Sequence, residues 1–223
     1  MKRYCDINEI SDGHLYKKED KVLADCKGCV NCHQCCQGMG DSIVLDPYDI
    51  YRLTKGCACG FDDLMQKQVA LTMDDGVILP HLQMDEETGC CAFLNEQGRC
   101  SIHAYRPGIC RLFPLGRIYE EDTFYYFLQV HECVKKDRSE VTVADWLQTD
   151  AMEEYEKYIM DWHNLLKEWK AIIKVKQDEN VIKQMVMYLI LQFFKKSYDP
   201  EQAFYPQFYE RLAEANEIME ELK

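Results

Sequence analysis

The last third of the chain carries apolar residues at steps of three and four, the spacing that places side chains on one face of a helix. One such run extends over residues 143–169, and a second run with a wider apolar stripe extends over residues 181–194. Asp199-Pro200 is expected to end the second helix, and Pro206 is expected to open a third. The pattern therefore predicts three helices whose apolar faces pack into a core.

The first two thirds of the chain has only short runs. Asp46-Pro47 has the residue types of a helix start, and residues 61–71 are expected to form another short helix. The other elements are predicted to be short strands and hairpins: strands over residues 77–79 and 92–94, and hairpins over residues 91–103 and 115–130. Such short elements bury little apolar surface, so metal ligation would have to take the place of a core in this region.

These patterns predict an α+β fold. We expect a metal-nucleated cysteine-rich domain of short helices and hairpins, with a helical C-terminal extension packed on it. The predicted boundaries are an N-terminal segment over residues 1–25, a cysteine-cluster metal-binding domain over residues 26–138 and the helical extension over residues 139–223. The division follows the composition, because all thirteen cysteines lie at or before Cys133.

Charge and hydropathy argue against nucleic acids and membranes as binding partners. With 39 acidic and 26 basic residues the net charge is −13, and such a surface repels nucleic-acid phosphates and anionic membranes. No apolar run is long enough to cross a membrane, and the first residues lack the apolar stretch of a signal peptide. We therefore expect a cytoplasmic protein that binds neither nucleic acid nor membranes. Thiols stay reduced in the cytoplasm, so thirteen cysteines indicate metal binding and not disulfides.

The densest cysteine motif spans residues 26–36. Three successive C-x-x-C steps lead from Cys26 to Cys35, and Cys36 follows at once. A C-x-x-C turn lets two thiolates converge on one metal, as in zinc knuckles and in ferredoxin-type iron–sulfur sites. Side chains of neighbouring residues diverge, so Cys35 and Cys36 indicate either two neighbouring metal centres or one ligand and one spectator.

A second group of cysteines follows later in the chain. The spacing of Cys91, Cys100 and Cys110 allows a hairpin and a loop to fold back over the first motif, and Cys133 can close the set. Four arginines crowd the same stretch: Arg99, Arg106, Arg111 and Arg117. Either they offset the negative charge of thiolates, or they lie on the surface in ion pairs with acidic residues.

The ordered motifs C-x-x-C-x-x-C-C, C-x-F-L…G-x-C-x-I-H and R-P-x-x-C-R-x-F-P resemble those of the YkgJ-like cysteine-cluster family, described as a zinc- or iron-chelating domain. The resemblance covers roughly residues 26–133. It implies eight metal ligands: Cys29, Cys32, Cys35, Cys36, Cys91, Cys100, Cys110 and Cys133. Five cysteines fall outside the shared pattern, as extra ligands or spectators: Cys5, Cys26, Cys57, Cys59 and Cys90.

The histidines near these motifs are weaker candidates. Family members often carry Tyr at the position of His103. His33 and His131 adjoin expected ligands, and each is a candidate ligand, a hydrogen-bond partner of a ligand or an exposed residue.

Three classes of function stay open on the sequence. The first is a metal-binding protein that holds an iron–sulfur cluster or zinc through Cys thiolates and serves in metal or redox handling. Iron–sulfur is favoured, because consecutive C-x-x-C steps are typical of ferredoxin ligation. Flagellin lysine N-methylases look like members of the same broad group, so the resemblance also implies S-adenosylmethionine-dependent methylation of a protein substrate. The third class is a structural zinc domain that presents its helices to a protein partner.

Overall fold

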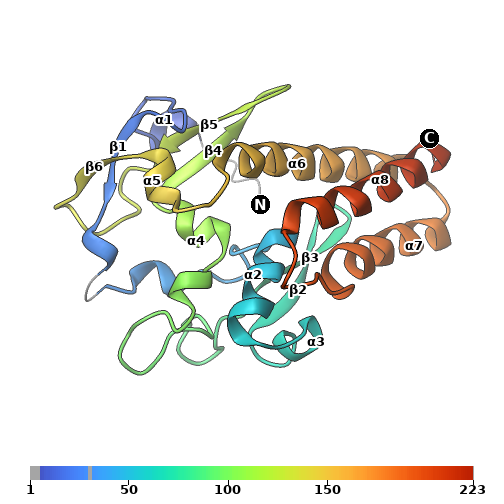
Figure 1. Ribbon diagram of the computed structural model, residues 1–223, viewed down its shortest axis with the longest axis horizontal. Coiled ribbons are helices and arrows are strands. Elements are labelled where there is room, and N and C mark those ends of the chain that lie inside the picture. Colours follow the sequence, from blue (N-terminus) through green and yellow to red (C-terminus); the bar gives the residue numbers. More distant parts are fainter. Residues whose placement is uncertain (1–5, 30–31, 223) are drawn as a thin grey trace.

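The computed structural model describes residues 6–29 and 32–222, and Cys5 lies outside this range. Helices and two-stranded antiparallel sheets alternate along the chain, so the predicted α+β class is confirmed, whereas metal nucleation stays a prediction. Figure 1 shows the C-terminal helices on one side of the molecule and the cysteine-bearing loops toward the other.

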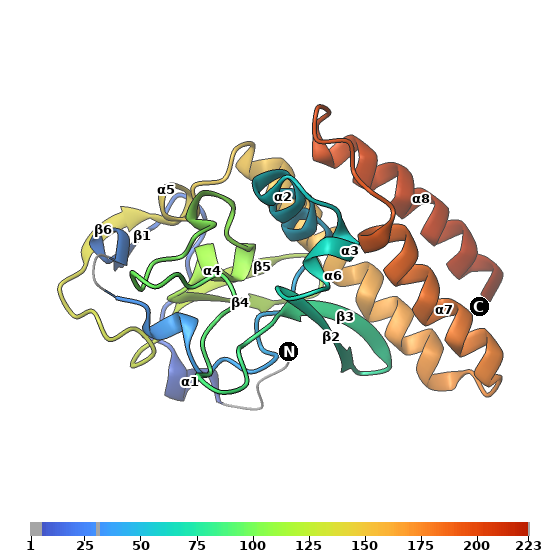
Figure 2. The same cartoon turned by 90° about the horizontal axis from the view of Figure 1, so that it is seen from below.

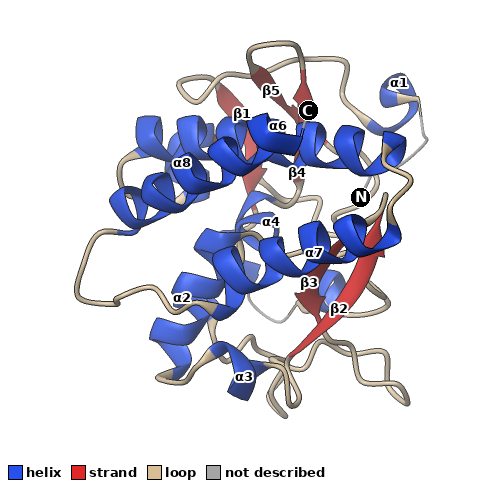
Figure 3. Cartoon of the chain, turned by 90° about the vertical axis from the view of Figure 1, so that its right-hand side faces the viewer, coloured by secondary structure: helices blue, strands red, loops and turns tan. Residues whose placement is uncertain are grey.

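Three helices form the C-terminal side and lie side by side in Figures 1 and 3: α6 (Met152–Val175), α7 (Glu179–Ile190) and α8 (Phe204–Leu222). A π-helical turn, Leu191–Lys195, directly follows α7. It ends four residues before Asp199-Pro200, where the sequence predicted the end of this helix. The prediction of a single helix over residues 143–169 is wrong. The segment forms two helices, α5 (Val143–Leu147) and α6, because Gln148 and Ala151 between them have φ values of 48° and 52°, which no α-helix accommodates.

The short helix α2 (Pro47–Cys57) begins where the sequence predicts. The carboxylate of Asp46 accepts the N–H of Asp49 at 2.9 Å, and the carboxylate of Asp49 accepts the N–H of Asp46 at 3.1 Å. This reciprocal pair is a capping box that satisfies backbone donors at the helix start.

The helix predicted over residues 61–71 is wrong in its second half. Helix α3 covers only Phe61–Leu64, and the chain then enters a hairpin of β2 (Val69–Asp74) and β3 (Val77–Leu82). The two residues between these strands, Asp75 and Gly76, both have positive φ, at 49° and 89°. An Asp-Gly pair with this geometry favours a two-residue hairpin turn, which explains why the residues before it form a strand and not the predicted helix.

Two further sheets complete the fold. The predicted hairpin over residues 115–130 is present as β4 (Leu115–Tyr119) and β5 (Phe124–Leu128), and β1 (Lys21–Asp25) pairs with β6 (Ser139–Thr142). The strand predicted over residues 92–94 is absent from the described chain, where this segment makes only isolated bridges. Two small helices remain: α1 (Ile7–Ile10) and α4 (Gly108–Leu112).

One large hydrophobic core joins the cysteine-bearing region to the C-terminal helices. Leu53 of α2, Val69 of β2 and Trp169 of α6 are completely buried in it. A smaller core joins β1, β4, β5 and α5. Residues 43–82 therefore have apolar packing of their own, and the expectation that metal replaces a core applies at most to the loops around them.

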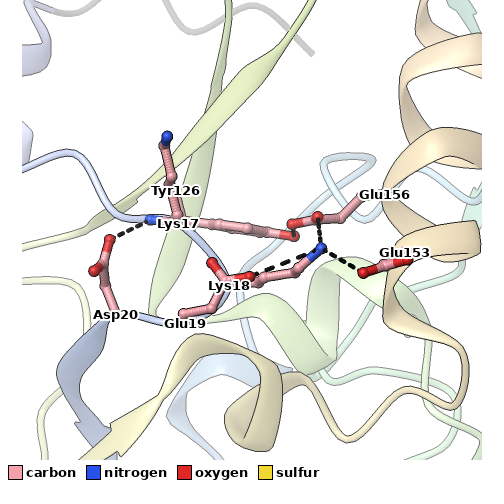
Figure 4. Close-up of polar contacts among 7 residues, drawn as sticks. All are labelled: Lys17, Lys18, Glu19, Asp20, Tyr126, Glu153 and Glu156. Atoms are coloured by element: carbon pink, nitrogen blue, oxygen red, sulfur yellow. Dashed lines mark hydrogen bonds and ion pairs between the residues drawn. The ribbon is translucent and has the colours of Figure 1, made fainter.

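Polar contacts fasten the N-terminal segment to α6. The ammonium of Lys18 lies 3.5 Å from a carboxylate oxygen of Glu156 and 3.6 Å from one of Glu153, and the hydroxyl of Tyr126 donates to Glu156 at 3.1 Å (Figure 4). Exposed pairs of this kind add little stability each, but they fix how the segment lies on α6. Among the described helices, none combines the length and apolarity needed to cross a membrane.

Candidate metal centre

The loops that bear the predicted ligands gather at the end of the molecule away from α7 and α8 (Figures 1 and 2). Backbone hydrogen bonds join two of these loops directly. The N–H of Cys91 donates to the carbonyl of Cys36 at 2.8 Å, and the N–H of Gly38 donates to the carbonyl of Gly89 at the same distance. The end of the C-x-x-C-C motif therefore lies beside Cys91, as the resemblance implies.

Cys100 is brought to this place by a tight loop. The predicted turn after Leu94 is present: the N–H of Gly98 donates to the carbonyl of Asn95 at 2.9 Å, and Leu94 and Cys100 face each other in an antiparallel bridge. The loop returns the chain close to its starting point, so Cys91 and Cys100 can face one site.

Cys110 is positioned by a buried carboxylate. It lies in α4, and the N–H of Gly108 at the start of that helix donates to Oδ1 of Asp49 at 2.6 Å. Asp49 is only 2% exposed and belongs to the capping box of α2. This contact connects the large core to the Cys110 segment. The sequence pattern predicts the helix start at Asp46-Pro47 but gives no sign of this second contact of Asp49, because residue spacing does not reveal it.

A cavity of about 1660 Å³ connects these segments. Of the eight predicted ligands, all but Cys133 line it: Cys29, Cys32, Cys35, Cys36, Cys91, Cys100 and Cys110. Thiols drawn from four separate segments thus meet around one space.

Four of these thiols, Cys35, Cys91, Cys100 and Cys110, act on one another, and we call them the inner thiols. Burial raises the pKa of Cys110 well above its usual range, and Cys91, Asp49, Cys35 and Cys100 raise it further. Burial also raises the pKa of Cys91 and Cys100, and the thiol of Cys35 adds to both shifts. Without a cation among them these thiols are held neutral, and a bound metal would reverse that balance.

A second group, Cys26, Cys29, Cys32 and Cys133, lies beside the first, and we call it the outer thiols. The sulfurs of Cys26 and Cys29 are 3.2 Å apart. Burial raises the pKa of Cys133, and the thiols of Cys26 and Cys32 contribute to the rise. Cys29 borders both groups, because the thiols of Cys26 and Cys35 both raise its pKa after burial does.

Backbone donors point at three of the predicted ligands. In each case an N–H two residues further along the chain hydrogen-bonds to the sulfur and lowers the pKa of the thiol against the larger effect of burial. The pairs are Phe93 to Cys91, Ile102 to Cys100 and Lys135 to Cys133. Such donors stabilise a thiolate, which is the form that binds metal.

The donor set fits a soft or borderline metal. Thiolates are the ligands of structural zinc and of iron–sulfur clusters, and hydrogen bonds to the sulfurs are part of both kinds of site. Over the described residues, no three Cys, His, Asp or Glu side chains already form a closed metal-binding arrangement. The thiols are gathered but still spread, so binding requires them to move closer together.

The four arginines divide into two pairs. Arg99 donates to the carbonyl of Cys29 at 2.8 Å, and the charge of Arg106 lowers the pKa of Cys35 and Cys100 against larger effects that raise it. Arg111 is 3% exposed and donates to Thr149, and Arg117 donates to the hydroxyl of Tyr155. Only the first pair acts on the thiols, whereas buried Arg111 and half-buried Arg117 join α4 and β4 to α5 and α6.

The remaining cysteines and histidines differ in their surroundings. Cys57 and Cys59 contact each other at the end of α2 and do not line the cavity, whereas Cys90 accepts a hydrogen bond from the side chain of Gln37 at 3.4 Å. His33 lines the cavity, as does His103, and His131 is exposed. Cys26 falls outside the shared pattern, yet its sulfur lies 3.2 Å from that of the predicted ligand Cys29.

Comparison with known proteins agrees with this geometry. Residues 26–139, about half of the chain, match the family model CxxCxxCC, described as a "putative zinc- or iron-chelating domain". The chain belongs to this family. The resemblance to a metal-chelating cysteine-cluster family is thereby confirmed, and the CxxCxxCC domain includes all eight predicted ligands. No match was found among curated proteins or among solved structures.

Proposed function

We propose that the CxxCxxCC domain binds its metal through Cys thiolates, with an iron–sulfur cluster favoured over zinc, and that the protein serves in metal or redox handling. The observation that supports this most directly is the group of inner thiols. Cys35, Cys91, Cys100 and Cys110 come from separate segments, yet they act on one another around a single cavity.

The preference for iron–sulfur rests on the motif. Consecutive C-x-x-C steps with a remote cysteine are typical of ferredoxin ligation, and the N–H groups aimed at Cys91 and Cys100 are of the kind that tunes iron–sulfur clusters. Zinc accepts the same thiolates without redox chemistry. Lysine methylation with S-adenosylmethionine stays an alternative that rests on family resemblance alone.

Anaerobic purification followed by analysis of metal and acid-labile sulfide tests the proposal. We expect tightly bound iron with a comparable amount of sulfide. Zinc without sulfide would retain thiolate binding and reject the cluster. If neither metal is present and all thirteen thiols react freely with a thiol reagent, the proposed function is wrong.

A further inference from the structure

We propose that this domain holds two metal centres, and that the outer thiols of Cys26, Cys29, Cys32 and Cys133 form the second. The inference rests on the proposed function, because both centres use thiolates of the same domain. It assigns a ligand role to Cys26, which the shared motif leaves out.

The turn between Cys26 and Cys29 is strained in a way that brings their sulfurs together. Lys27, Gly28 and Cys29 have φ values of 58°, 69° and 56°, and two of these three residues carry a side chain. A left-handed backbone conformation is unfavourable for a residue with a side chain, so a run of this kind needs a compensating interaction. Here the backbone curls until the two sulfurs are 3.2 Å apart.

That separation is close to the geometry of a four-thiolate site. With metal–sulfur bonds of about 2.3 Å, tetrahedral coordination places neighbouring sulfurs about 3.8 Å apart. The pair of Cys26 and Cys29 therefore needs to open by less than about 1 Å to hold a metal ion.

Contacts outside the turn hold it in place. The guanidinium of Arg99 donates to the carbonyls of Cys29 and Gly28, at 2.8 and 3.4 Å, and the N–H of Cys32 donates to the carbonyl of Cys29 at 3.0 Å. Arg99 thus keeps the turn closed from the neighbouring loop, and the hydrogen bond to Cys29 holds Cys32 beside it.

Cys133 reaches this turn through the sheet of β1 and β6. Asp25 and Ser139 pair across that sheet, and the hydroxyl of Ser139 donates to the Asp25 carboxylate at 3.0 Å. The ammonium of Lys27 lies 2.5 Å from the carboxylate of Asp137. These contacts bring the segment that follows Cys133 against the Cys26 turn.

The two groups have different neighbours. The thiols of Cys26 and Cys32 lie near that of Cys133, whereas those of Cys91, Cys35 and Cys100 lie near that of Cys110. Cys26 and Cys133 lie outside the cavity that the inner thiols line, whereas Cys29 and Cys32 border it from the side of the outer group. One ion at either place would leave the other group unligated.

A half-buried arginine lies beside the outer group. Nε and Nη1 of Arg138 are shielded from solvent and have no hydrogen-bond partner in the described structure, and its guanidinium lies close enough to Cys133 for their charges to interact. A divalent ion bound by four thiolates carries a net charge of −2, which this guanidinium would partly neutralise. Loading balances as one M²⁺ and four thiols giving one four-thiolate complex and four protons released to solvent, with no change of oxidation state.

Titration of the full-length, reduced, metal-free chain with Co²⁺ under argon tests the inference, because thiolate-to-cobalt absorption reports each centre directly. We expect two equivalents of Co²⁺ in the unchanged protein. Cys26→Ser and Cys133→Ser should each bind one equivalent, and retention of the inner equivalent shows that those variants are folded. Cys110→Ser should also bind one equivalent, and Cys57→Ser, as the matched control, should bind two.

Each other outcome has a definite meaning. A single equivalent in the unchanged protein that is lost in Cys110→Ser and kept in Cys26→Ser contradicts the second centre and leaves the proposed function standing. Loss of all Co²⁺ in both Cys26→Ser and Cys110→Ser indicates one shared cluster and also overturns the inference. No thiolate-to-cobalt absorption in the unchanged protein overturns the proposed function itself.

Discussion

Asp49 connects the hydrophobic core to the cysteine cluster. One oxygen of its buried carboxylate accepts the N–H of Gly108, and the other accepts the N–H of Asp46. Both donors would be left without a partner if the carboxylate were removed. A side chain that the sequence marks only as a helix-start residue thus sets the place of Cys110.

Replacing Asp49 by Ala should therefore lower the free energy of unfolding by about 1–3 kcal/mol, the cost of leaving buried donors unsatisfied. Urea unfolding of the metal-loaded protein measures this. Asp63→Ala is the matched control, because Asp63 accepts the N–H of exposed Gly60 at the start of α3 and is not among the neighbours of the inner thiols. We expect the control to cost less than about 1 kcal/mol. Equal losses of unfolding free energy in the two variants would mean that the buried hydrogen bonds of Asp49 stabilise the protein no more than an exposed helix cap does.

The carboxyl of Asp49 should also make the stability of the protein depend on pH. Burial, and then the neighbouring carboxyl of Asp46, raise the pKa of Asp49 to about 7. An aspartate in the unfolded chain titrates near about 3.9, so the folded state holds this proton more tightly between roughly pH 4 and pH 7. The stability that it contributes is present at the acidic end and is lost as pH rises to 7.

Asp49→Asn removes this titration, so the free energy of unfolding of the wild type should fall relative to that of the variant between pH 5 and pH 7. Chemical unfolding of both proteins at several pH values gives the difference, in which the pH dependence of metal binding largely cancels. A constant difference across the range would show that Asp49 is ionised in the folded protein throughout.

At the scale of elements, the loops with the cysteines differ from the segments that carry the core. In residues 26–29, 32–40 and 84–107 the regular structure is limited to 3₁₀ turns and isolated bridges, and these loops contribute only Phe93 and Ile102 as buried residues of the large hydrophobic core, to which α2, β2 and β3 contribute many more. Binding free energy at a site that is absent from the unfolded chain adds to folding free energy, and it should act mainly where apolar packing is thin.

Hydrogen exchange on the chelated protein should show this division. We expect fast exchange over residues 32–40 and 84–107 after metal removal, and retained protection in α6, α7 and the hairpin of β2 and β3. Loss of protection in all of these elements together would mean that the metal supports the entire fold. Unchanged protection in the loops would assign the metal to chemistry and not to architecture.

The elements also show what periodicity can and cannot predict. The C-terminal helices and the hairpin over residues 115–130 follow from apolar spacing, because their cores are regular. The break between α5 and α6 does not, because Gln148 and Ala151 are residue types that rarely take a positive φ. The hairpin of β2 and β3 carried a usable signal in Asp75-Gly76, which our sequence analysis passed over.

The division of the ligands into two groups is harder to predict from the sequence. C-x-x-C spacing is a local constraint that indicated Cys29, Cys32 and Cys35, whereas the family resemblance implied the other predicted ligands that line the cavity: Cys36, Cys91, Cys100 and Cys110. The closeness of Cys26 and Cys133 depends instead on the pairing of β1 with β6, which joins segments more than a hundred residues apart. No spacing rule contains that pairing, so the second group of thiols emerged only from the fold.

Over the whole molecule, two kinds of stabilisation are distinct. An apolar core shared by the helices and by α2, β2 and β3 maintains the scaffold, and the thiols beside it line the cavity in which we propose that metal binds. Cys57 and Cys110 make the distinction testable, since both cysteines pack against the large core and only Cys110 lines the cavity.

The most direct test is therefore the metal content per chain of Cys110→Ser and Cys57→Ser, each purified anaerobically beside the unchanged protein and shown by circular dichroism to retain its helices. The account predicts that Cys110→Ser loses the metal of the inner thiols, because a soft thiolate ligand is lost there, and that Cys57→Ser keeps the full amount. Equal metal content in all three proteins, or an equal loss in both variants, would contradict it.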